Sequence, residues 1–106
     1  MIAQASPAVS RDRQVQFGAP VLSQYDQRMR AVELTIQLLI ARTARGEHWS
    51  EGFKAAGKLL AALPLTIAMS ASVNRHFQNA VAYSQQAEFG ASTFELRAVR
   101  GQLLRL

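Results

Sequence analysis

The sequence predicts an all-α protein, a small bundle of about four helices preceded by a flexible N-terminal tail. Apolar side chains recur at steps of three and four residues through most of the chain after residue 20. Serine, glycine and proline residues separate these runs where helices would begin and end. No segment of this region alternates apolar and polar side chains as a half-buried strand does. The 106 residues are enough for one domain with a modest core.

Residues 1–20 are predicted to form the tail, because Pro7, Gly18 and Pro20 punctuate them and no helical period is visible. The segment QVQFG alternates weakly, so Val15 and Phe17 would need a surface to pack on, in this domain or in a partner. Residues 21–106 are predicted to be the helical domain. Whether the tail becomes ordered on binding is left open.

The first helix is predicted to begin at Ser23, which together with Asp26 resembles a capping box, and to end at Gly46. One face of this helix carries side chains at helical spacing: Tyr25, Met29, Val32, Ile36, Leu39 and Thr43. Leu34, Leu38 and Ala41 make a second side of it apolar. A helix that is apolar on two sides is either central in a bundle or part of an interface.

The second helix is predicted to begin near Ser50 and to end or kink at Pro64. Its buried stripe is formed by Trp49, Phe53, Ala56, Leu60 and Leu63. A third helix follows over about 65–89, closed by Gly90. Its face is marked by Leu65, Met69, Val73, Phe77, Ala80 and Val81. Since Ser70 or Ser72 would also suit a fresh helix start, one long helix and two shorter ones are both open.

The last helix is predicted to begin at Ser92, where the sequence STFE forms a capping box of Ser92 with Glu95. Its buried side is predicted to comprise Leu96, Val99, Leu103 and Leu106. All connections between these helices are short. Neighbouring helices are therefore expected to run antiparallel.

No catalytic, cofactor or metal site is expected, so the protein is not predicted to be an enzyme. The segment GFKAAGKLL (residues 52–60) matches the glycines and lysine of a P-loop, but Leu59 replaces the required serine or threonine and the period is helical. His48 and His76 are far apart and lack a metal-ligand spacing. The chain has no cysteine, which excludes a disulfide framework and thiolate chemistry.

The protein is expected to be soluble and cytoplasmic. Its longest uncharged run, residues 59–74, is shorter than the roughly 20 apolar residues of a membrane span, and it contains proline, serine and asparagine. The N-terminus lacks the basic start and apolar core of a secretory signal. The absence of cysteine is compatible with a reducing compartment.

A DNA-binding regulator is the alternative function. The segment MSASVNRHFQNAVAY (residues 69–83) is similar to the recognition helix of AraC-type regulators, which runs roughly S-x-x-x-L-x-R-x-F. The match is one residue short, and a core stripe explains the same apolar positions. A DNA-recognition helix over residues 70–84 would contact the DNA through Arg75, Gln78 and Asn79. Arg75 is the only cation between Lys58 and Arg97, so nucleic acid is the less favoured partner.

Protein binding is the favoured function, and a homodimer is expected. The formal net charge is +5, with ten arginines and two lysines, and arginine suits interfaces because it makes planar, bidentate contacts. Aromatic residues and arginine also dominate binding hot spots. The predicted contact residues are Tyr25, Met29, Arg42, Trp49 and Phe53. The competing interpretation is that the aromatic residues only fill the core.

The segment YDQRMRAVELTIQLLIARTARGEHWSEGFKAAGKLLAAL resembles the QslA-type small quorum-sensing anti-activators. The resemblance covers about residues 20–105 and includes no compact motif. It implies a homodimeric helical protein that binds a LuxR-type transcription activator at the activator's dimerisation surface, so that the activator cannot hold its promoter. A toxin–antitoxin or secretion-chaperone component would also be small, helical and dimeric, and the sequence does not separate it from this class.

Overall fold

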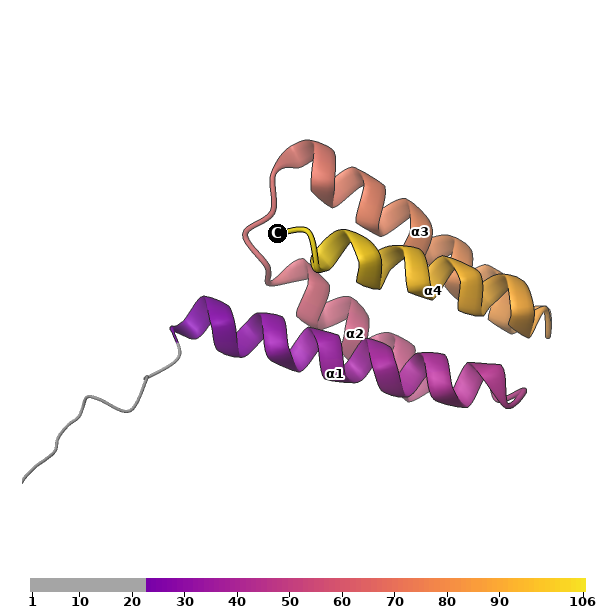
Figure 1. Cartoon of the computed structure of the whole chain (residues 1–106). Helices are drawn as coiled ribbons and strands as arrows, with labels where there is room; N and C mark the ends of the chain where they lie inside the picture. Colours follow the sequence, from indigo (N-terminus) through magenta and orange to yellow (C-terminus); the bar gives the residue numbers. More distant parts are fainter. Residues whose placement is uncertain (1–22) are drawn as a thin grey trace, which may run out of the picture.

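The computed structural model describes residues 23–106, which fold into four α-helices and contain no strand. The helices are α1 (Gln24–Ala44), α2 (Ser50–Ala61), α3 (Ile67–Gln85) and α4 (Phe89–Leu103) (Figure 1). The all-α prediction is confirmed. The predicted tail, residues 1–20, lies outside the described residues.

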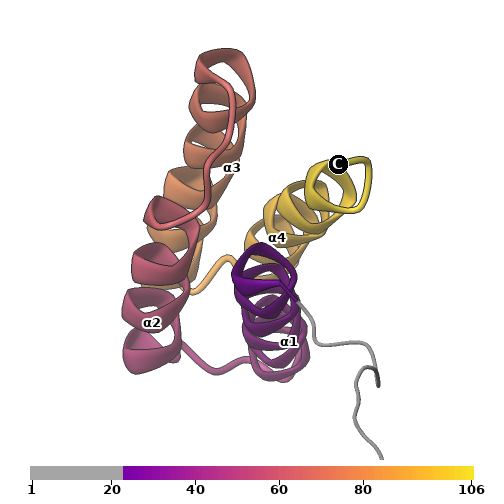
Figure 2. The same cartoon turned by 90° about the vertical axis from the view of Figure 1, so that its left-hand side faces the viewer.

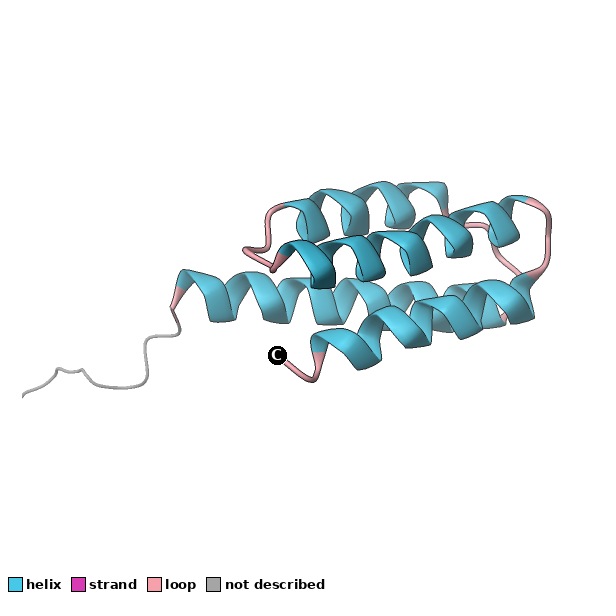
Figure 3. Ribbon diagram, turned by 90° about the horizontal axis from the view of Figure 1, so that it is seen from above, coloured by secondary structure: helices cyan, strands magenta, loops and turns pink. Residues whose placement is uncertain are grey.

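Consecutive helices run in opposite directions, as the short connections predicted (Figure 1). Viewed from the end where α1 begins, α1 and α4 form one row and α2 and α3 form the other (Figure 2). The view from above shows that long helices joined by short loops make up this part of the chain (Figure 3). The most extensive contact is between α3 and α4, followed by those of α1 with α4 and with α2. Every helix therefore has one side against the interior and another toward solvent.

The core is built from the predicted apolar stripes. Val32, Ile36 and Leu39 of α1 and Leu96 and Val99 of α4 belong to one core cluster, and all five are fully buried. The other buried apolar side chains are Phe53, Ala56, Leu60, Leu63, Val73, Phe77, Ala80 and Leu103. Leu106 was expected on the buried side but is exposed. It follows the end of α4 at Leu103, so it no longer keeps the helical register.

Three of the predicted helix boundaries are confirmed: the start of α1 at Ser23, its end at Gly46 and the start of α2 at Ser50. Ser23 caps α1 by accepting a hydrogen bond from the Asp26 N–H at 3.1 Å. Gly46, with φ of +85°, follows the end of α1. Residues 67–85 form a single helix rather than two, which settles the open alternative. Thr66 begins this helix by accepting from the Met69 N–H at 3.1 Å, so neither Ser70 nor Ser72 is needed as a cap.

The predicted start of the last helix at Ser92 is wrong, because α4 begins at Phe89, three residues earlier. Ser92 lies inside the helix, is fully buried, and donates a hydrogen bond to the Ala80 carbonyl of α3 at 2.7 Å. The predicted closure of the third helix at Gly90 is also wrong. Ala87, with φ of +60°, makes the reversal instead, and Gly90 belongs to α4.

Candidate protein-binding surface

The five predicted contact residues do not form one patch. Tyr25 and Met29 lie in the first two turns of α1, whereas Arg42 lies in its last turn. A helix rises about 1.5 Å per residue, so Tyr25 and Arg42 are roughly 25 Å apart along the axis. Trp49 begins α2 at the same end of the bundle as Arg42. The five predicted residues therefore lie in three separate places: Arg42 with Trp49, Tyr25 with Met29, and Phe53 by itself.

Arg42 and Trp49 form a polar–aromatic contact between the last turn of α1 and the start of α2. The Arg42 guanidinium carbon lies 4.0 Å from the centroid of the Trp49 ring, a cation–π arrangement. Arg42 Nε also lies 3.9 Å from Glu47 Oε1. The Trp49 ring lies on Gly52, where an added Cβ would come within 2.2 Å of Cε3. Trp49 is partly buried against the core, so this pair presents more of its arginine than of its ring.

Phe53 is a core residue in this structure, with only 5% of its surface exposed. Its ring stacks on His48 at 5.6 Å and is tilted against Phe77 at 5.9 Å between centroids. The interpretation that aromatic residues fill the core applies to this side chain. A partner would reach Phe53 only if α2 moved away from α3.

The broadest apolar surface on α1 lies opposite the core. Leu34 and Leu38 are 56% and 55% exposed, and Ala41 is exposed beside them. Steps of four and three residues place these side chains on one face, which we call the α1 outer face (Leu34, Leu38 and Ala41). A soluble monomer usually exposes large apolar side chains singly rather than as a row. This face is the second apolar side that the sequence predicted for the helix.

Several exposed apolar side chains outside α1 were not among the five predicted contact residues. Phe94 of α4 is 69% exposed, Leu104 is 57% exposed, and Ile67 at the start of α3 is 91% exposed. Phe94 falls outside the Leu96, Val99 and Leu103 stripe, and this offset was the available sequence signal. It was masked by the incorrect start of α4, which treated the residue as part of a cap.

Two histidine pairs join segments that are distant in the sequence. His48 Nδ1 lies 2.7 Å from Ser84 Oγ, beside a shallow depression of about 200 Å³. Ser84 is almost completely buried, and no acidic side chain orients this histidine among the hydrogen bonds of residues 23–106, so the pair lacks the parts of a nucleophilic triad. His76 donates from Nδ1 to Glu95 Oε1 at 2.6 Å, linking α3 to α4. Sequence spacing gave no signal for either pair.

The residues of the DNA-binding alternative share the outer side of α3. Arg75, Gln78 and Asn79 are all exposed. In a helix-turn-helix the second helix crosses the first at about 90–120°, whereas α3 runs back along α2 here (Figure 1). Arg75 also donates to His76 Nε2 at 3.3 Å. This arrangement gives the alternative no specific support.

Within residues 23–106, no three histidine, cysteine, aspartate or glutamate side chains gather where they would bind a metal ion. None of the four described helices combines the length and the apolar character needed to cross a membrane.

Comparisons with known proteins do not identify a family for this chain. No protein-family model, no curated protein and no solved structure matches the chain.

Proposed function

We propose that this protein is a small regulatory protein-binding module, an anti-activator that binds a LuxR-type quorum-sensing transcription factor and blocks its dimerisation and DNA binding. The class of partner comes from the resemblance of the sequence to QslA-type anti-activators. The mode of action comes from the surface of the helical bundle. Such a mechanism needs only a rigid face that competes for an apolar subunit interface.

The α1 outer face is the observation that carries this proposal. Leu34 and Leu38 each keep more than half of their surface in water. Covering what remains exposed of both would contribute about 1.5–3 kcal/mol, since full burial of one leucine contributes about 1.5–3 kcal/mol. The opposite side of α1 is anchored by Val32, Ile36 and Leu39, which are fully buried. Little conformational entropy would therefore be lost when a partner binds this helix.

A homodimer is part of the proposal. The α1 outer face is apolar, so the same face on a second copy would be complementary to it in chemistry, and the activator would replace that second copy when it binds. Arg42 lies near one end of α1 and retains about two-fifths of its side-chain exposure. An arginine at the rim of an apolar patch is typical of protein interfaces.

The test is a pull-down with the tagged full-length chain, performed with and without nuclease and read by mass spectrometry. We expect one stoichiometric protein that survives nuclease treatment, a LuxR-type activator. The double variant Leu34→Gln and Leu38→Gln should lose this partner, because both changes fall on the α1 outer face. Ile67→Gln is the matched control, since Ile67 is 91% exposed and lies on α3.

Two results would contradict the proposal. Equal retention of the partner by the double variant and by the Ile67 control would exclude the α1 outer face as the binding surface. Recovery of nucleic acid alone, lost on nuclease treatment, would favour the DNA-binding alternative. That alternative also predicts an affinity for duplex DNA that falls steeply with salt and that Arg75→Gln weakens.

A further inference from the structure

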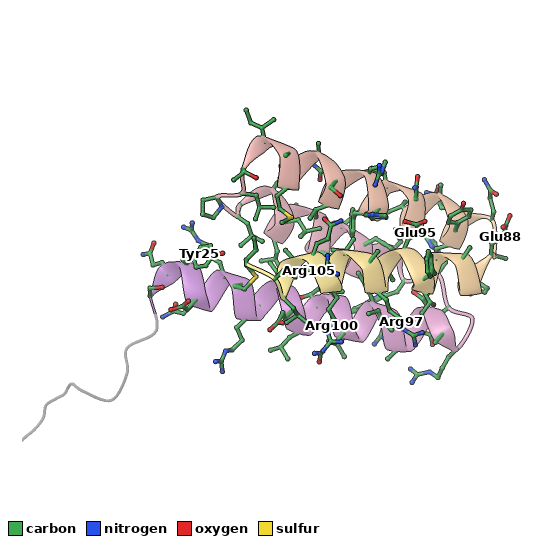
Figure 4. The ribbon with its side chains drawn as sticks, turned by 45° about the horizontal axis from the view of Figure 1, so that its top comes forward. Tyr25, Glu88, Glu95, Arg97, Arg100 and Arg105 are labelled. Atoms are coloured by element: carbon green, nitrogen blue, oxygen red, sulfur yellow. The ribbon has the colours of Figure 1, made fainter. Side chains whose placement is uncertain are left out.

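Two arginines of α4 and one just past its end lack an acidic partner in the part of the chain that the structure describes. Arg97, Arg100 and Arg105 form no ion pair with any carboxylate of residues 23–106. Glu95 on the same helix is paired with His76 of α3. In Figure 4, Arg97 and Arg100 leave α4 on the side of α1, while Glu95 leaves it on the opposite side. Arg105 follows the end of α4 and borders a depression with Met69 and Ser72 of α3, so it lies toward α3. We call Arg97, Arg100 and Arg105 the α4 arginine row.

The middle member of the row is held in place by packing. Arg100 is partly buried, and its Nε has no solvent contact and no hydrogen-bond partner. A side chain fixed in this way has already lost much of its rotamer freedom. A guanidinium presented from a fixed stem binds a carboxylate at a lower entropic cost than a free surface arginine does.

Large apolar side chains accompany the row. Phe94 lies one turn before Arg97 and is 69% exposed, and Leu104 lies beside Arg105 and is 57% exposed. Between them, a Cβ added to Gly101 would meet nothing within 4 Å. The surface thus combines two apolar contacts with an open strip of helix backbone, which allows a second helix to approach closely.

We infer that the α4 arginine row, together with Phe94 and Leu104, is a docking surface for an acidic amphipathic helix of a partner protein. The row runs over the nine residues from Arg97 to Arg105, of which the last two follow the end of α4, and its eight residue steps rise about 12 Å along the extended helix axis. Glutamate or aspartate residues spread over about two turns of a partner helix would match this length. Their apolar neighbours would cover Phe94 and Leu104. Charge complementarity of this kind sets the register and raises the rate of association.

Other occupants fit this surface less well. In a symmetric dimer through this face, the arginines of one copy would lie against those of the other, and like charges repel. Nucleic acid is bound through many phosphate contacts, whereas this face offers three cations interrupted by exposed phenylalanine and leucine side chains. An acidic protein helix satisfies both the charged and the apolar parts.

This inference rests on the proposed function only in requiring a protein partner, because it concerns α4 and not the α1 outer face. The probe is a fluorescein-labelled, stapled helical peptide of about 16 residues with glutamates at steps of three and four along one face beside leucines. The control peptide has the same composition, with its glutamates distributed around the helix. Fluorescence anisotropy with the full chain should show the patterned peptide binding at least about tenfold more tightly.

Charge-removing variants then assign the site. The exposed pair Arg97→Gln and Arg105→Gln should weaken binding of the patterned peptide by at least about tenfold. The matched control, Arg28→Gln with Arg45→Gln, removes the same amount of charge from α1 and its end. It should change the affinity for the patterned peptide by less than about twofold. Phe94→Ala should also weaken binding, although no charge is altered. Circular dichroism of each variant checks that the helices are intact.

Three outcomes would overturn the inference. Equal affinity for the patterned and scrambled peptides would show only a general attraction to acidic molecules. An equal loss in the α1 control would show the same. Tighter binding of duplex DNA or of phosphatidylserine vesicles, lost in the Arg97 and Arg105 variant, would assign the face to nucleic acid or membrane. Loss of the LuxR-type partner in the Leu34 and Leu38 variant with peptide binding unchanged would separate this surface from the proposed function.

Discussion

Trp49 and Gly52 show how one missing side chain positions a residue at the molecular surface. The indole covers the Gly52 backbone so closely that a Cβ there would lie 2.2 Å from the ring. Such a contact forces the ring itself to move, because the nearest atoms belong to the rigid indole rather than to a flexible side-chain end. The Arg42 stack depends on this ring and would move with it.

Gly52→Ala is therefore expected to lower the free energy of unfolding by about 1–3 kcal/mol, as overpacking typically does. Urea denaturation measures this change. Gly101→Ala is the matched control, because its Cβ would enter open space. Because Gly101 lies in the interior of a helix, its replacement by alanine should raise the free energy of unfolding by up to about 1 kcal/mol. Equal effects of the two substitutions on the free energy of unfolding would show that the contact with Trp49 does not require glycine at position 52.

Phe53 and Phe94 separate a core role from a surface role for the same side chain. Phe53→Ala should cost about 3–5 kcal/mol of unfolding free energy, because the ring is buried against His48 and Phe77. Phe94→Ala should change stability by less than about 0.5 kcal/mol. Thermal and urea unfolding of both variants test the pair. A stable, folded Phe53 variant with weakened partner binding would instead favour the contact role predicted from the sequence.

At the scale of the element, two helices end in the same way with different residues. After α1, the Glu47 and Gly46 N–H groups bond to the Arg42 and Thr43 carbonyls. After α3, the Glu88 and Ala87 N–H groups bond to the Tyr83 and Ser84 carbonyls at 2.8 and 3.0 Å. Both sets form the Schellman arrangement, which requires a left-handed residue. Gly46 meets this requirement without strain, whereas Ala87 adopts φ of +60° with a Cβ.

Ala87→Gly is consequently expected to stabilise the protein by about 0.5–1 kcal/mol, because relief of the left-handed strain exceeds the added chain entropy of glycine. The measurement is the midpoint of chemical denaturation. Ala82→Gly, at an exposed position inside α3, serves as the control and should destabilise by about 1 kcal/mol. Destabilisation at both positions would contradict the assigned end of α3.

At the scale of the whole molecule, the bundle leaves apolar surface on two sides. The α1 outer face lies opposite the core, and Phe94 and Leu104 lie beside the α4 arginine row. These surfaces differ in charge, since one is a row of leucine and alanine and the other carries three arginines. A self-complementary contact therefore suits α1 and is opposed on α4.

Light scattering after size-exclusion chromatography should give twice the mass of the chain at micromolar concentration, according to the proposed homodimer. Leu34→Gln with Leu38→Gln should give a monomer with its helical content retained, since neither leucine belongs to the core. Arg97→Gln with Arg105→Gln should leave the dimer intact. A wild-type monomer at every accessible concentration would exclude the homodimer and leave the α1 outer face to the activator alone.

The sequence by itself determined the helical class, the four apolar stripes and the starts of α1 and α2, because these follow from local periodicity and from the bonding needs of helix ends. It also indicated that α1 is apolar on two sides. It could not place the start of α4, since Ser92 has the chemistry of a cap and is used instead for a buried bond to Ala80.

Only the tertiary structure decided which apolar residues are covered. Phe53 and Trp49 belong to one stripe, yet the contact of α2 with Phe77 of α3 buries the first, while the second is only partly buried. The tertiary structure also decided which polar side chains meet. The pairs His48–Ser84 and His76–Glu95 join residues that are 36 and 19 positions apart in the sequence. Helical spacing describes one helix at a time, and burial depends on which other helix lies against each face.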